Sequence, residues 1–140
     1  MELIAVAIQE IAENENVLFT DTIARGNCSI THRAGSGLIT LRGYTDQCRA
    51  RYKVSFGGNI AIPTGGTVEA ISVAISINGE AVASSTAIVT PQAVEEFNNV
   101  FNSVYIDVPR GCCYTISVKN VSEQAIEIQN ANLIVERVAW

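Results

Sequence analysis

The chain has 140 residues, of which 48% are hydrophobic and 16% charged, with a formal net charge of −5. This length fits one domain with one core, so we expect residues 1–140 to form a single domain. The acidic balance and nine scattered basic residues argue against a nucleic-acid groove, which needs clustered Lys and Arg. A surface so poor in charge can be buried against copies of itself at little desolvation cost, so we expect a homo-oligomer.

The first residues carry no targeting pattern. The apolar run from Leu3 ends at Ile8 and has no basic residue before it, so we expect neither a secretion signal nor a membrane span. Folding in a cytosol then predicts reduced, mostly buried thiols. With no Cys-x-x-Cys spacing and one histidine, no metal site is expected. The four cysteines are Cys28, Cys48, Cys112 and Cys113.

Short segments that alternate between apolar and other residues follow one another along the whole chain. We count about ten, which is typical of an all-β sandwich or barrel. A longer segment, residues 51–62, places Tyr52, Val54 and Phe56 on one face before Gly57-Gly58, where we expect a bulge or bend. The segments before it are residues 3–9, 17–20, 27–32 and 38–42.

Asn78-Gly79 marks the turn of a long predicted hairpin. Apolar residues recur at every second position before it, and this pair readily adopts the positive φ angles of a type I′ turn. A two-residue loop there places Ile77 opposite Glu80 and Ile75 opposite Val82. We expect the Ile and Val face of the hairpin to fill the core, and its Ala, Ser and Thr face to lie against neighbouring protein.

Three further elements are predicted beyond this hairpin. Thr90-Pro91 fits the N-cap and first position of a short helix. Residues 104–108 and 114–118 alternate on either side of a Pro-Arg-Gly turn and predict a second hairpin. In residues 125–140 the apolar positions change parity, so we expect the buried face to switch across residues 130–132.

Five segments together resemble the tumour necrosis factor-like jelly roll, in its complement globular-head branch: VLFTD at 17–21, GNCSITHRAGSGLITLRG at 26–43, ARYKVSFGGNIAI at 50–62, AISVAISINGEAV at 70–82 and YTISVKN at 114–120. The resemblance implies an all-β antiparallel sandwich of about ten strands in two sheets, assembled as a trimer. Under it, the trimer axis would be lined partly from the long strand. The interface candidates are Tyr52, Val54, Phe56, Tyr105 and Trp140.

Residues 68–120 and QNANLIVERVA at 129–139 are also similar to small virion structural proteins of phages and prophages of gut Firmicutes. This similarity implies a non-enzymatic bacteriophage protein, a trimeric capsid decoration protein of the head auxiliary or head fibre kind, which assembles by β-sheet face packing. Its partners would be itself and the major capsid or other virion proteins, without nucleic acid or membrane. Its location would be the virion, after assembly in the host cytoplasm.

Two other functions remain open. One is a recognition module on a phage tail, baseplate or cell surface, which would bind a glycan or receptor through loops such as 98–103 and 43–47. The other is an enzyme acting through His32, the only histidine. Because no nucleophile elbow accompanies it and carboxylate pairs are usually solvated, we expect no catalytic residue, cofactor or metal. The carboxylate pairs are Glu95-Glu96, Glu123 with Glu127, and Glu13 with Glu15.

Overall fold

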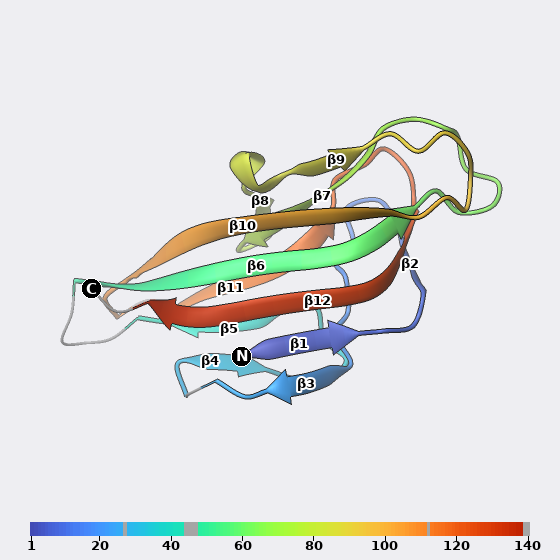
Figure 1. The fold of residues 1–140 in the computed structure, drawn as a ribbon. Coiled ribbons are helices and arrows are strands. Elements are labelled where there is room, and N and C mark those ends of the chain that lie inside the picture. Colours follow the sequence, from blue (N-terminus) through green and yellow to red (C-terminus); the bar gives the residue numbers. More distant parts are fainter. Residues whose placement is uncertain (27, 44–47, 112, 139–140) are drawn as a thin grey trace.

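The computed structural model describes residues 1–26, 28–43, 48–111 and 113–138. They form two antiparallel six-stranded sheets that pack face to face (Figure 1). The strands of sheet A are β1 (Glu2–Ala5), β2 (Gln9–Ile11), β3 (Asp21–Ala24), β6 (Arg49–Ala61), β10 (Asn98–Pro109) and β12 (Ile126–Val138). Those of sheet B are β4 (Ile30–His32), β5 (Ile39–Arg42), β7 (Ile71–Ile77), β8 (Glu80–Ala81), β9 (Ala87–Val89) and β11 (Cys113–Asn120).

The strand order is β10-β6-β12-β1-β3 in sheet A, where β2 also pairs with β12. Sheet B has the order β4-β5-β11-β7-β8, and β9 pairs with β7. The predicted two-sheet antiparallel sandwich is confirmed, with twelve strands among the described residues in place of about ten. The difference arises because short breaks separate β1 from β2 and β8 from β9. No helix of the described residues is long and apolar enough to cross a membrane.

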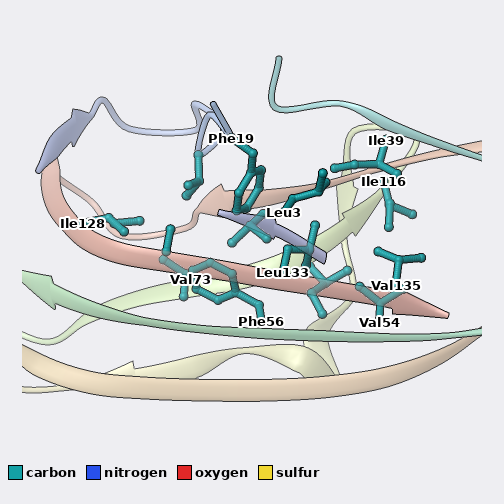
Figure 2. Packing of buried hydrophobic residues seen from close by; sticks show 14 of the residues in the cluster. Leu3, Phe19, Ile39, Val54, Phe56, Val73, Ile116, Ile128, Leu133 and Val135 are labelled. Atoms are coloured by element: carbon teal, nitrogen blue, oxygen red, sulfur yellow. The ribbon is translucent and has the colours of Figure 1, made fainter. Parts of the chain in front are cut away.

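The core lies between the two sheets and is built from alternate residues of the long strands. In β6 the side chains of Tyr52, Val54 and Phe56 are fully buried. Figure 2 shows Val54 and Phe56 beside Leu133 and Val135 of β12, on the same side of sheet A. Sheet B contributes residues such as Val73 and Ile116 from the other side (Figure 2). Alternation therefore buries one face of each sheet in a shared apolar layer.

The first predicted hairpin is confirmed at its turn. Asn78 and Gly79 have φ angles of 52° and 87°, and Ile77 pairs with Glu80. The amide of Val82 donates to the carbonyl oxygen of Ile75 over 2.8 Å, as the predicted register requires. Beyond this point the short 3-10 helix η1 (Ala83–Ser85) interrupts the returning strand before β9 pairs with β7 again.

The outer face of β7 is covered in part by this chain itself. Ala74 and Ser76 are fully buried although they point away from the core. Lys119 lies opposite Ala74, and its Nζ donates to the carbonyl oxygen of Gly79 over 2.8 Å. On the same face, the hydroxyls of Ser76 and Ser117 hydrogen-bond to each other. This small-residue face, expected to lie against neighbouring protein, already has a cover within the chain.

Two local predictions are wrong. Thr90-Pro91 begins a turn region and no helix, because Glu95 has a φ of 60° and its amide donates to the carbonyl oxygen of Ile62 over 2.8 Å. Strands β10 and β11 do not form a hairpin, since they belong to different sheets. The chain crosses between the sheets after Pro109, and β10 pairs instead with β6 along its whole length.

The switch of buried face in β12 is confirmed. Gln129 pairs with Asn59 and Asn132 with Gly57, so this stretch of β12 carries one residue more than β6 opposite. Asn130 sits at the bulge with a φ of 57°. The bulge lets Ile128 and Leu133, which differ in parity, both reach the core (Figure 2).

Candidate functional site: the outer face of sheet A

The outward-facing residues of β10, β6 and β12 form one continuous surface, which we call the A face. Three cross-strand rows define it, because opposite residues of paired strands share a face. The rows are Tyr105–Lys53–Glu136, Ser103–Ser55–Ile134 and Phe101–Gly57–Asn132.

Large apolar side chains stand exposed on this face around a centre of small residues. Phe101 is 66% exposed, Tyr105 65% and Ile134 41%. Between them, the hydroxyls of Ser55 and Ser103 lie 3.0 Å apart and hydrogen-bond to each other. Exposed aromatic residues that rim a small-residue, uncharged centre are typical of a protein contact surface.

Phe101 is held over a glycine. A Cβ placed on Gly57 would lie 3.7 Å from the Cδ2 of Phe101, an ordinary contact. The ring therefore leans across β6 above the space that Gly57 leaves. The aromatic edge of the A face has a defined position because the strand beneath it carries no side chain there.

An ion pair fixes the other aromatic residue. Arg51 donates from Nε to Oδ1 of Asp107 over 2.8 Å and from Nη2 to Oδ2 over 3.1 Å. Its guanidinium carbon lies 6.0 Å from the ring centre of Tyr105. The hydrogen bond from Arg51 lowers the pKa of Asp107, and the same bond raises the pKa of Arg51. Both groups stay charged at neutral pH, so the pair and the stacked ring persist.

The predicted interface residues divide into three groups. Tyr52, Val54 and Phe56 are wrong as interface residues, because their side chains are fully buried between this chain's own sheets. Tyr105 is exposed on the A face, where an interface residue has to be. Trp140 lies outside the described residues.

Phe101 and Ile134 were not among the predicted interface residues. Phe101 has the same parity as Tyr105 in β10, and Ile134 lies on the outward parity of β12 beyond its bulge. Extending the alternation from Val104 back through Ser103 would have found Phe101. Ile134 could be placed only with the bulge known, since a bulge reverses which residues face out.

The residues considered for chemistry lie apart from the A face. His32 is half-buried, and its Nε2 lies 2.7 Å from the carbonyl oxygen of Ser36. Cys28, Cys48 and Cys113 are exposed free thiols, which corrects the expectation of buried ones, while Cys112 lies outside the described residues. No group of three His, Cys, Asp or Glu side chains within the described ranges is arranged to hold a metal ion.

The two predicted recognition loops have different outcomes. Residues 98–103, expected as a recognition loop, are part of strand β10. Residues 44–47 of the second such loop lie outside the described part of the chain.

The structure brings together a carboxylate pair that differs from the predicted ones. Hydrogen bonding with Glu127 lowers the pKa of Glu95, and hydrogen bonding with Glu95 raises the pKa of Glu127. Thr64 supports the ionised partner, because its amide and hydroxyl donate to Oε1 of Glu95 over 3.0 and 2.9 Å. The two carboxyl groups therefore interact at one end of the sandwich, between the turn after β9 and the start of β12.

Comparison with solved structures identifies the fold. The globular domain of a zebrafish complement 1qA protein superposes with a TM-score of 0.62 at 9% identity, over 95% of this chain and 93% of that domain. The fold is a C1q/TNF-like jelly roll. Murine APRIL superposes on this jelly roll with a TM-score of 0.60 at 11% identity, over 94% of this chain and 95% of APRIL. No protein-family model matches the sequence, and no curated protein does.

Proposed function

We propose that this C1q/TNF-like jelly roll is a non-enzymatic assembly protein that self-associates as a trimer through the A face. The observation that carries the proposal is the exposure of Phe101, Tyr105 and Ile134 on one face of sheet A. Full burial of an apolar side chain of this size contributes about 1.5–3 kcal/mol, so a repeated contact through these three favours association.

The chemistry between the three side chains supports close contact. Gly57, Ser55 and Ser103 occupy the middle of the A face, and none of them carries a charge that would have to be desolvated. The neighbouring Arg51–Asp107 pair is already internally neutralised. A second copy can therefore approach this part of the sheet closely.

We propose a virion as the setting. The resemblance of residues 68–120 and 129–139 to virion structural proteins supports a capsid decoration role on a bacteriophage particle, with the major capsid or other virion proteins as partners. Assembly in the host cytoplasm fits the three described thiols, which are free and exposed. The A face supplies the self-association that such a role requires.

The proposal is tested by light scattering coupled to size exclusion. Wild-type protein should elute with the mass of three copies, and Phe101→Glu combined with Tyr105→Glu should elute as a folded monomer. Ile88→Glu is the matched control, because Ile88 is 67% exposed on β9 of sheet B, away from the A face. A wild-type monomer at micromolar concentration, or a double variant that stays trimeric, would overturn the proposal.

A further inference from the structure

Charge is segregated along the length of the sandwich. The segments at one end, which we call the glutamate end, are residues 9–16, 62–70, 90–98 and 121–127, and none of them contains Lys or Arg. The loops after β6 and β9 belong to this end and stand at the right in Figure 1. Most of the acidic side chains at this end are exposed. All the acidic residues of this end are Glu10, Glu13, Glu15, Glu69, Glu95, Glu96, Glu123 and Glu127.

The opposite end, which we call the arginine end, gathers most of the basic residues. Strand pairing places them together: Pro109 pairs with Arg49, and Cys113 with Arg42. The amide of Arg42 in turn donates to the carbonyl oxygen of Ser29 over 2.9 Å. The arginines of this end are Arg25, Arg42, Arg49, Arg110 and Arg137. Asp107 also lies near this end, and its Oδ2 is 3.7 Å from the Nε of Arg49.

The two ends act as separate electrostatic surfaces. Strand β6 runs between them over 13 residues, which at about 3.3 Å per residue separates the ends by about 40 Å. Salt screens charges over about 8 Å at physiological ionic strength. The arginines of the arginine end therefore do not neutralise the glutamates of the glutamate end.

Like charges at the glutamate end already oppose one another. Hydrogen bonding with Glu95, burial, and the charges of Glu95 and Glu10 all raise the pKa of Glu127. The lysine that lies opposite Ala74, Lys119, directs its Nζ away from this end to the carbonyl oxygen of Gly79. A cationic surface that approached the glutamate end would relieve this repulsion.

We propose that copies of this protein stack head to tail, with the arginine end of one copy against the glutamate end of the next. The occupant is a second copy because each end offers the charge that the other lacks. The contact is heterologous, so it joins copies or trimers into open stacks. It uses neither Phe101 nor Tyr105 and does not rest on the A face.

Charge reversal at each end tests the stacking. The glutamate-end variant combines Glu13→Lys, Glu15→Lys and Glu123→Lys, and the arginine-end variant combines Arg25→Glu and Arg42→Glu. All five side chains are exposed, so circular dichroism should show both variants folded. Matched controls on the flanks of the sandwich are Asp21→Lys and Arg33→Glu, which are also exposed.

The readout is the mean mass by light scattering at about 0.01 M and about 1 M salt, where the screening length falls from about 30 Å to about 3 Å. We expect wild type and both controls to gain about twofold or more in mean mass at low salt, the rise that results when each unit joins at least one other. Each end variant alone should lose this gain, and an equimolar mixture of the two should recover it. A salt-independent wild-type mass, a gain that persists in either end variant, or a mixture without recovery would overturn the stacking. The high-salt mass reports the A face separately.

Discussion

Asn102 on β10 donates a hydrogen bond from its buried side-chain amide to the carbonyl oxygen of Ser85 in η1. Ser85 is buried too, and its hydroxyl accepts from the amide of Ile75 over 2.9 Å and donates to the carbonyl oxygen of Val82 over 2.7 Å. These bonds link the edge strand of sheet A to the hairpin of sheet B. The interruption of the hairpin by η1 is therefore what closes this side of the sandwich.

Replacing Asn102 by Ala should destabilise the fold by about 1–3 kcal/mol, because the buried Ser85 carbonyl loses its side-chain donor. Urea unfolding measures this as a lower midpoint at an unchanged slope. Asn99→Ala is the matched control, since the exposed Asn99 of the same strand donates to the carbonyl oxygen of Gly58 over 3.3 Å and to Oδ1 of Asn59 over 3.2 Å. Because these bonds are longer and closer to solvent, this variant should lose less stability than Asn102→Ala. Equal effects of the two variants would contradict the assigned link.

Asn120 joins three segments of the chain through one buried amide. Its Nδ2 donates to the carbonyl oxygens of Ile11 and Gln124 over 3.0 and 2.9 Å, and its Oδ1 accepts from the amide of Ser122 over 2.9 Å. We expect Asn120→Ala to cost about 3 kcal/mol or more, because several buried backbone groups lose their partner together. Thermal unfolding checks this, and a melting temperature within the error of wild type would disprove the role.

Tyr52 anchors the arginine end of the core through its hydroxyl, which donates to the carbonyl oxygen of Arg42 over 2.6 Å. Tyr52→Phe should lower stability by about 1–2 kcal/mol while leaving the oligomeric mass unchanged. The paired readout separates a core role from an interface role. Loss of oligomer in this variant at full retention of fold would restore Tyr52 to the interface.

Glu127 should make stability depend on pH. Because its pKa in the folded protein is raised above the ordinary value of 4.5, the folded state holds this proton more tightly than the unfolded state. The contribution of Glu127 to stability is present below pH 4.5 and is lost as the pH rises through the folded pKa. Glu95 has the opposite sign, since its lowered pKa contributes stability that is lost as the pH falls below 4.5.

Glu127→Gln places a permanent hydrogen-bond donor beside Glu95 and removes the negative charge that Glu127 carries when it is ionised. We expect a higher melting temperature than wild type at neutral pH and a difference that shrinks as the pH approaches 4.5, where wild-type Glu127 is increasingly protonated. Glu123→Gln, at an exposed position of the same end, should show no such pH-dependent gain. A constant difference across this range would show that the neighbouring carboxylates do not raise the pKa of Glu127.

Local sequence signals predicted local structure well. Asn78-Gly79 specifies its turn through backbone preference alone. The parity change of the apolar residues across Asn130 predicted the switch of buried face that the bulge in β12 produces. Alternation likewise predicted that Tyr52, Val54 and Phe56 share a face. It could not say which face is buried, because a period of two defines two faces without naming the one that meets the other sheet.

Features that depend on the arrangement of the sheets could not be predicted from local alternation. Strands β10 and β11 follow each other around a turn, yet they pair with β6 and with β5 and β7. Glu95 and Glu127 are far apart in sequence and meet only because the turn after β9 and the start of β12 share one end of the sandwich. Which strands become neighbours is decided by packing of the whole domain.

Sedimentation equilibrium of the wild-type protein in about 1 M salt, where end-to-end charge contacts are screened, tests self-association through the A face most directly. The A face should hold three copies together, so the predicted mass is three times the chain mass of 15.0 kDa. A mass of 15.0 kDa at micromolar concentration would contradict the account.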